Sequence, residues 1–287
     1  MTRLPMTSAS VRPRSILITG CSSGIGLCVA QGLQQRGWRV FATARKPEDV
    51  ISLQERGLEA LFLDVTDEES IDTALAVVLG RTGGTLDALF NNAGYGQPGA
   101  VEDLTRAALL EQFDTNVFGA QMVTNRVLPI MRQQGHGRIL YNSSILGFAA
   151  MPLRGAYNAS KFAMEGLVDT LRLELHGSNI HPVLIEPGPI SSRFRPNAFL
   201  AYQRHIAGRP SVYQDIYNGL EARLRQEGPV TGFTLGPEAV LTAVLKALNS
   251  KRPAPRYRVT FPTKLFAVLK RLLPTRWLDW AARKAGT

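Results

Sequence analysis

The chain has 287 residues, of which 45% are hydrophobic and 20% are charged, and it carries a formal net charge of +10. These values exclude a disordered chain and a collagen-like fibre, and two cysteines are too few for a small disulfide scaffold. A chain of this length buries about three quarters of its unfolded surface, which predicts one large domain.

The low cysteine content favours a reducing compartment such as the cytoplasm. No apolar run reaches the roughly 18 residues of a membrane span. Residues 1–14 lack the apolar block of a secretory signal, and we expect them to form a short mobile tail.

The positive charge is concentrated at the C-terminal end. From Lys251 to Thr287 the chain has ten lysines or arginines and one acid, Asp279. Bases alternate with apolar residues from 264 to 273, which predicts an amphipathic helix within a basic extension over residues 261–287. One possible arrangement is that the helix docks on its own domain and leaves its basic face in solvent. The alternatives are contact with the inner face of a membrane or with an acidic partner. We predict no nucleic acid partner, because no helix-turn-helix, zinc or stacking pattern accompanies the charge.

Short apolar runs alternate with helical patterns along residues 15–190. The expected strands are 15–19, 38–42, 58–63, 86–90, 138–142 and 182–186. The expected helices are 25–36, a short one that starts at 47, 68–79, a long one over 104–134, and 157–175. Strands that are apolar on both faces and alternate with helices are typical of a parallel sheet. We therefore predict an α/β, doubly wound (Rossmann) fold with helices on both faces of the sheet.

The pattern changes after residue 190. Between 191 and 236 regular periodicity is lost, and so long a stretch in a compact domain is typical of a lid. Its aromatic residues are candidates either for the wall of an apolar substrate pocket or for packing the lid on the body: Phe194, Phe199, Tyr202, Tyr213 and Tyr217. A helix over 237–248 and a strand over 256–260 complete a single domain, expected over residues 15–260 with a mostly seven-stranded sheet.

A glycine-rich turn follows the first expected strand and precedes the first expected helix. It reads Thr19-Gly20-Cys21-Ser22-Ser23-Gly24-Ile25-Gly26. Glycines at 20, 24 and 26 permit a tight turn and the close approach of a pyrophosphate to the backbone, and the helix N-terminus favours its negative charge. Strand, turn and helix in this order predict a dinucleotide site that includes Ser22, Ser23 and Ile25.

The end of the second strand indicates which dinucleotide is preferred. NAD sites usually place an acid there, which binds the ribose 2′-hydroxyl. Here Ala44 occupies that position and Arg45 follows it. A guanidinium can bind a 2′-phosphate that a carboxylate would repel, so the sequence favours NADP(H). The alternative is that Arg45 is a solvated loop residue.

Tyr157 and Lys161 stand four residues apart at a helix start and share one face. An ammonium about 5 Å from the phenol oxygen would lower a tyrosine pKa by roughly two units at an effective dielectric of about 20. Ser144 lies just after the fifth strand, at the edge where ligands bind in such folds, and can donate to a substrate oxygen. Asn116 lies inside the long helical stretch, where a buried amide requires a partner.

Four motifs in order give the chain a family resemblance over nearly its full length. They are Thr19–Gly26, Asn91–Gly94, the set Asn116, Ser144, Tyr157 and Lys161, and the Pro187-Gly188 step. In these motifs the chain resembles the short-chain dehydrogenase/reductase family. The resemblance implies that Tyr157 transfers the proton, that Lys161 binds the nicotinamide ribose and lowers the tyrosine pKa, and that Ser144 holds the substrate oxygen. It also implies that Asn116 supports a water linking Lys161 to solvent.

The same resemblance implies further cofactor contacts. Asp64 and Val65 would lie at the adenine, and Asn92, Ala93 and Gly94 would line the adenosine side. Beyond the sixth strand, the residues implied to hold the carboxamide end are Pro187, Gly188, Ile190 and Ser192. Ser143 is a rival for Ser144, although the 13-residue spacing to Tyr157 favours Ser144.

Four segments make the resemblance closer to one branch of the family. They are 20–26, 186–190, 235–240 and 268–274, which are similar to bacterial NADP-dependent aldehyde reductases. That branch is related to hydroxysteroid and retinol dehydrogenases, so it implies reduction of an aldehyde or a bulky apolar ketone. It also implies a homo-oligomer, either a dimer or a tetramer.

A non-catalytic NADP-binding scaffold with a partner-binding tail stays the rival hypothesis. The four histidines are His136, His176, His181 and His205. Their spacing is not that of metal ligands, so no metal site is predicted.

Overall fold

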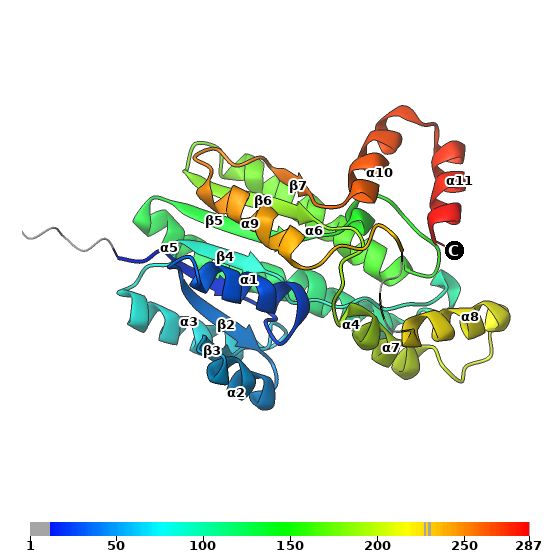
Figure 1. Cartoon of the computed structure of the whole chain (residues 1–287), viewed down its shortest axis with the longest axis horizontal. Helices are drawn as coiled ribbons and strands as arrows, with labels where there is room; N and C mark the ends of the chain where they lie inside the picture. Colours follow the sequence, from blue (N-terminus) through cyan, green and yellow to red (C-terminus); the bar gives the residue numbers. More distant parts are fainter. Residues whose placement is uncertain (1–11, 227, 229–230, 287) are drawn as a thin grey trace, which may run out of the picture.

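A single parallel sheet organises the computed structural model, which describes residues 12–226, 228 and 231–286. Within these residues the sheet has seven strands in the order β3-β2-β1-β4-β5-β6-β7, as Figure 1 shows. The strands are β1 (Ser15–Ile18), β2 (Arg39–Ala44), β3 (Glu59–Phe62), β4 (Ala88–Asn91), β5 (Gly137–Asn142), β6 (Ile180–Glu186) and β7 (Arg256–Arg258). The predicted doubly wound fold is therefore confirmed. The strand order reverses between β1 and β4, where Leu17 pairs with Phe41 on one side and with Leu89 on the other.

Helices cover both faces of the sheet because its strands are apolar on both faces. The helices that pack on it are α1 (Gly24–Gln34), α2 (Pro47–Glu55), α3 (Glu68–Thr82), α5 (Ala120–Gln134), α6 (Gly155–Glu174) and α9 (Glu238–Asn249). One core lies under α1, α2 and α9, with Val29, Leu53 and Val244 fully or almost fully buried. The other core lies under α3, α5 and α6, with Ile71, Val127 and Val168 buried.

The long helix expected over 104–134 is interrupted. The chain forms α4 (Arg106–Phe113), then a wider π-helical turn over Asp114–Gly119, and then α5. Gly119, the last residue of this turn, lies against Val65, since a Cβ on Gly119 would lie 2.7 Å from a Val65 methyl group. The π turn carries Asn116 into the interior. Such turns inside α-helices are frequent at functional sites.

The stretch from 191 to 236 contains two helices, so the expectation of irregular structure is wrong there. They are α7 (Phe194–His205) and α8 (Gln214–Arg225). The pair is held by a separate aromatic cluster rather than by the main core. In that cluster Tyr202 and Tyr217 are buried with their ring centroids 5.9 Å apart. Its role as a lid stays a prediction.

The described residues include a small part of the expected N-terminal tail and nearly all of the expected C-terminal extension. Residues 1–11 of the expected N-terminal tail lie outside the described residues, whereas Arg12 forms an ion pair with Asp87 at 3.0 Å. The C-terminal extension forms two helices, α10 (Phe261–Leu272) and α11 (Thr275–Gly286), which stand side by side at one end of the molecule in Figure 1. None of the helices in the described residues is long and apolar enough to cross a bilayer.

The glycine turn after β1 is locked onto the end of β4. Thr19 Oγ1 accepts hydrogen bonds from the backbone N–H groups of Asn92 and Ala93, each at 3.0 Å. Gly26 closes the turn, because a Cβ at this position would lie 2.3 Å from the Gly20 carbonyl oxygen and 2.6 Å from Asn92 Nδ2. Backbone cannot retreat from such a contact as a flexible side chain can, so only glycine fits.

We predict that Gly26→Ala destabilises the protein by about 1–3 kcal/mol, the usual cost of overpacking a tight interior. Thermal unfolding followed by circular dichroism measures this effect. The matched control is Gly166→Ala in α6, where a Cβ meets nothing within 4 Å. That variant should gain about 0.5–1 kcal/mol from helix propensity. Equal unfolding temperatures for the two variants would contradict the assigned packing.

Candidate active site

The carboxyl ends of β1, β4, β5 and β6 meet at one edge of the sheet, where the strand order reverses. This is the position at which doubly wound folds bind ligands. Tyr157 and Lys161 reach this edge from the start of α6, and both side chains are buried. Lys161 Nζ lies 5.7 Å from the centroid of the Tyr157 ring and donates a 2.6 Å hydrogen bond to the Asn142 carbonyl at the end of β5.

The two rival serines after β5 point to different partners. Ser144 Oγ accepts a hydrogen bond from the Leu146 N–H at 3.1 Å and hydrogen-bonds Tyr157. Ser143 Oγ donates to Glu165 Oε1 at 2.7 Å and is buried. The structure therefore brings Ser144 to the tyrosine and turns Ser143 away from it.

Asn116 is fully buried and fixed by the backbone beside it. Its Oδ1 accepts from the Tyr95 N–H at 3.1 Å, and its Nδ2 donates to the Tyr95 carbonyl at 3.0 Å and to Ser160 Oγ at 3.1 Å. A Cβ placed on Gly94 would lie 3.0 Å from Asn116 Oδ1 and 3.9 Å from Lys161 Nζ. Asn116 and Lys161 thus flank the same glycine, and all four expected reactive residues gather at this edge.

Burial controls the protonation of the reactive pair. It raises the pKa of Tyr157 to about 12, against a smaller lowering by the hydrogen bond with Ser144. Burial also lowers the pKa of Lys161 to about 8, opposed by the negative charge of Glu165. Desolvation of the phenolate is the larger cause of this shift, and a lowering of the tyrosine pKa by Lys161 stays a prediction. At neutral pH the phenol keeps its proton and can donate it.

The turn between β1 and α1 fits a pyrophosphate. A Cβ on Gly20 would lie 2.8 Å from Ala93 Cα, and one on Gly24 would lie 2.9 Å from Ser192 Cβ, so neither position has room for a side chain. The first turn of α1 holds no acid, and Ser23 makes no side-chain cap, which leaves its N–H groups to an anion. Ser22 is exposed beside them, and Ile25 lies half-buried in the first turn.

Hydrogen bonds connect this turn to the reactive lysine. Asn92 Nδ2 donates to the carbonyl oxygens of Thr19 and Gly20, each at 2.9 Å. Asn92 Oδ1 accepts from Asn142 Nδ2 at 3.0 Å, and the Asn142 carbonyl accepts from Lys161. The two parts of the site are therefore parts of one network.

The adenosine end of the expected cofactor site is open to solvent. Ala44 is the buried last residue of β2, and Arg45 follows it with an exposed side chain. Asp64 follows β3, and its Oδ1 accepts from the Thr66 N–H at 3.0 Å and from the Thr66 hydroxyl at 2.8 Å. Val65 is buried against Gly119 and therefore supports the site through packing.

A segment after β6 closes over the glycine turn. Pro187 is buried, and a Cβ on Gly188 would lie 2.1 Å from Thr260 Oγ1. Ile190 forms a parallel bridge with Leu235. Ser192 contacts Gly24 and accepts a hydrogen bond from the Phe194 N–H at 3.3 Å. This segment links the turn to α7.

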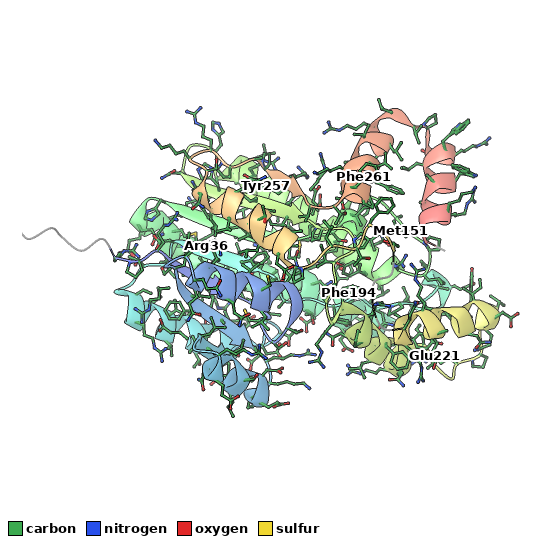
Figure 2. All side chains as sticks on the ribbon, in the orientation of Figure 1. Arg36, Met151, Phe194, Glu221, Tyr257 and Phe261 are labelled. Atoms are coloured by element: carbon green, nitrogen blue, oxygen red, sulfur yellow. The ribbon has the colours of Figure 1, made fainter. Side chains whose placement is uncertain are left out.

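Of the five aromatic candidates in the 191–236 stretch, the structure places Phe194 at the site. Its ring centroid lies 5.2 Å from that of Tyr157 in an edge-to-face arrangement, and it also contacts Gly96. The other four pack among themselves. Figure 2 shows Phe194 and Met151 at the end of the sheet that α10 also borders. No periodicity could have singled out Phe194, because its neighbour across the site is 37 residues away in the sequence.

One residue that the sequence analysis missed is Glu165. It lies one helical turn after Lys161, is buried, and also contacts Arg256 at 3.5 Å. The four-residue spacing between Lys161 and Glu165 is the signal that could have indicated the pair. Glu186, the last residue of β6, is fully buried with its oxygens 3.0 and 3.1 Å from Arg256 and Arg258. Within the described residues no group of three or more His, Cys, Asp or Glu is placed to hold a metal ion.

Comparison with known proteins agrees with this geometry. The family model described as short chain dehydrogenase matches residues 14–202. The uncharacterized oxidoreductase YbbO of Escherichia coli is 43% identical over 272 residues, which cover 95% of each chain. The 3-ketodihydrosphingosine reductase of Bacteroides thetaiotaomicron is 34% identical, with 95% of this chain and 98% of the relative covered. Retinol dehydrogenase 8 of Bos taurus is also 34% identical, with 92% of this chain and 86% of the relative covered.

A solved structure supports the same assignment. The crystal structure of a short-chain dehydrogenase from Streptomyces avermitilis superposes with a TM-score of 0.74 at 29% identity, and the match covers 96% of this chain and 98% of that chain. The family model covers more than half of the present chain, and relatives above 30% identity cover nearly all of it. The chain is an oxidoreductase that belongs to the short-chain dehydrogenase/reductase family.

Proposed function

We propose that the protein is an NADP(H)-dependent reductase that converts an apolar aldehyde or bulky ketone to an alcohol. The observation that carries the proposal is the buried Tyr157, which hydrogen-bonds Ser144 and lies beside Lys161, the residue at which the network from the glycine turn ends. A scaffold that only binds a dinucleotide requires the turn but has no need for this arrangement.

Each reactive residue has a separate role in the proposed reaction. A nicotinamide dinucleotide held by the glycine turn would supply the hydride that reduces the carbonyl carbon. Ser144 and Tyr157 hold the substrate oxygen, and Tyr157 gives it a proton as negative charge develops there. Lys161, protonated in most molecules below its pKa of about 8, stabilises the phenolate that remains. The same groups serve alcohol oxidation when Tyr157 begins as the phenolate, so the direction follows the ratio of reduced to oxidised cofactor.

The preference for NADP(H) rests on the end of β2. Arg45 is exposed immediately after the buried Ala44, and no acid lies at that strand end. A guanidinium there can bind a 2′-phosphate with two hydrogen bonds, whereas the ribose of NAD would lack its usual carboxylate partner.

The substrate class follows from the side chains around Tyr157. The tyrosine lies in an apolar cluster with Ile145, Leu146 and Phe266, and Phe148 and Met151 pack against it. Such a lining favours an apolar carbonyl compound over a charged one. Relatives whose names refer to retinol and to 3-ketodihydrosphingosine fit this class. A retinol or hydroxysteroid dehydrogenase is therefore the alternative function.

Replacing the proton donor tests the proposal. Purified protein with NADPH is screened against aldehydes, ketosteroids and retinal by loss of the reduced-cofactor absorbance, and each active substrate is repeated with Tyr157→Phe. We expect turnover to fall by at least about 10²–10⁴-fold, the usual contribution of a positioned acid. Cofactor affinity, measured by calorimetry, should change little because the phenol oxygen is all that is lost. Full turnover by Tyr157→Phe would refute the role, and no turnover of any carbonyl by the native chain would favour the scaffold.

The two serines provide a matched pair for the same assay. Ser144→Ala should lower kcat by about 10²-fold, because a donor to the developing oxyanion is removed. Ser143→Ala should lower stability by about 1 kcal/mol through the lost Glu165 hydrogen bond and should leave kcat within tenfold.

Cofactor preference provides an independent test. In the double variant Ala44→Asp, Arg45→Leu, a carboxylate replaces the guanidinium, so the ratio of kcat/KM for NADPH to that for NADH should fall by at least about tenfold. Arg56→Leu, an exposed arginine at the far end of α2, is the control and should leave the ratio unchanged. If both variants have the same kcat/KM ratio as the native protein, Arg45 does not bind the 2′-phosphate.

A further inference from the structure

The C-terminal helices expose an ordered apolar surface. On α10 the exposed apolar residues are Phe261, Leu265, Val268 and Leu272, whose spacing of four, three and four residues places them in one stripe. On α11 Trp277 and Trp280 are 64% and 53% exposed and lie three residues apart. We call these six side chains the outer face of the α10–α11 pair.

The opposite sides of the same helices are packed on the body. Phe266 of α10 and Ala282 of α11 are buried in the cluster that contains Tyr157, with Leu278 and Ala281 packed against it. Lys270 Nζ lies 5.1 Å from the centroid of the Phe162 ring on α6. The outer face is therefore exposed on helices that are held in place.

Basic residues border the outer face. Lys264 and Arg271 are exposed on one side of the α10 stripe, and Arg276 is exposed at the start of α11. Lys284 Nζ lies 4.7 Å from the centroid of the Trp280 ring. Asp279 is the single acid of α10 and α11, against six lysines and arginines. Apolar residues, tryptophans and bases on one face are the combination that binds at the boundary between lipid headgroups and acyl chains.

The apolar surface continues toward the cofactor end of the site. The exposed Phe233 stacks on Phe261 with the ring centroids 5.5 Å apart, and Leu235 is exposed two residues later. Leu235 is the residue that forms a bridge with Ile190 in the segment over the glycine turn. Figure 2 shows Phe261 at the base of α10, on the same end of the molecule as Phe194 and Met151.

We propose that the outer face of α10–α11 docks on an anionic lipid surface. The helices would lie in the interface, with Trp277, Trp280 and the α10 stripe at the acyl boundary and Lys264 and Arg271 at the acidic headgroups. A second copy of the chain fits this face less well, because pairing two such faces brings like charges together. Resting on the proposed function, this orientation places the apolar cluster around Tyr157 next to a membrane, from which a lipid-like carbonyl substrate could enter.

Tryptophan fluorescence gives a direct readout. The chain has three tryptophans, and the third, Trp38, is buried in the main core. A blue shift on addition of vesicles therefore reports on α11. Full-length protein is mixed with phosphatidylcholine vesicles, with or without phosphatidylglycerol, and bound protein is separated by flotation at low and at high salt. We expect binding and a blue shift with phosphatidylglycerol, and loss of both in high salt because the charges are screened.

Matched variants locate the contact. Val268→Ser with Leu272→Ser should weaken partitioning about tenfold or more, because two apolar side chains no longer enter the interface. Its control changes the same residue types at exposed positions elsewhere, Val212→Ser with Leu173→Ser. Lys264→Gln with Arg271→Gln should weaken partitioning by roughly 25-fold, from about fivefold for each charge removed. Lys246→Gln with Arg106→Gln, both exposed on other helices, is its control.

These experiments measure vesicle binding and not enzyme activity. A negative result would therefore contradict the lipid-docking proposal without bearing on the proposed reductase activity. Far-UV circular dichroism and the unfolding temperature show whether each variant is folded. Equal flotation of the outer-face variants and their controls overturns the proposal, and so does equal binding to vesicles without phosphatidylglycerol. A dimer in sedimentation velocity that Val268→Ser with Leu272→Ser converts to a monomer, without vesicle binding by the native chain, assigns the face to a second copy instead.

Discussion

The site depends on one chain of hydrogen bonds that crosses the sheet edge. It runs from Lys161 Nζ to the Asn142 carbonyl, from Asn142 Nδ2 to Asn92 Oδ1, and from Asn92 Nδ2 to the carbonyls of Thr19 and Gly20. Each link joins a different element, so α6, β5, β4 and the glycine turn are fixed relative to one another. In the proposed reductase these contacts would set the distance between a pyrophosphate on the turn and a carbonyl beside Tyr157. Hydrogen bonds of this kind favour one arrangement of the interior, because breaking one leaves a buried donor or acceptor without a partner.

A second polar cluster lies behind the reactive residues. Arg256 of β7 reaches Glu186 at 3.0 Å, Glu165 at 3.5 Å and Asp169 at 2.5 Å. Burial and the neighbouring Glu165 raise the pKa of Glu186 to about 7. Buried charges of this kind are expensive to desolvate and rarely serve stability alone. Here Glu165 also orients Ser143 and lies one turn from Lys161, so the cluster tethers the edge strand β7 to the helix that carries the reactive lysine and tyrosine.

Two helical pairs, distant in sequence, converge on Tyr157. Phe194 comes from α7, which leads into the segment held by its own aromatic cluster, and Phe266 comes from α10. The proposed reductase therefore has a reaction centre built by the sheet and an apolar wall built by additions to it. Because the outer side of α10 carries the exposed stripe, one helix would both line the substrate region and contact a lipid surface. Substrate choice and membrane attachment would then be properties of the same short segment.

Local pattern predicted the parallel sheet and the glycine turn, because buried strands and tight turns are each encoded by a few consecutive residues. The grouping of Asn116 with Ser144, Tyr157 and Lys161 was implied by the family resemblance. The sequence also distinguished the neutral body from the basic C-terminal extension. Several features were decided only by tertiary contacts. Val65 against Gly119 accompanies the π turn in the expected long helix, and a separate aromatic cluster organises α7 and α8. Phe194 and Glu165 take their places at the site through partners from other elements, and burial raises the pKa of Tyr157. The reason is physical: desolvation and packing depend on what covers a residue, and the covering residues come from distant parts of the chain.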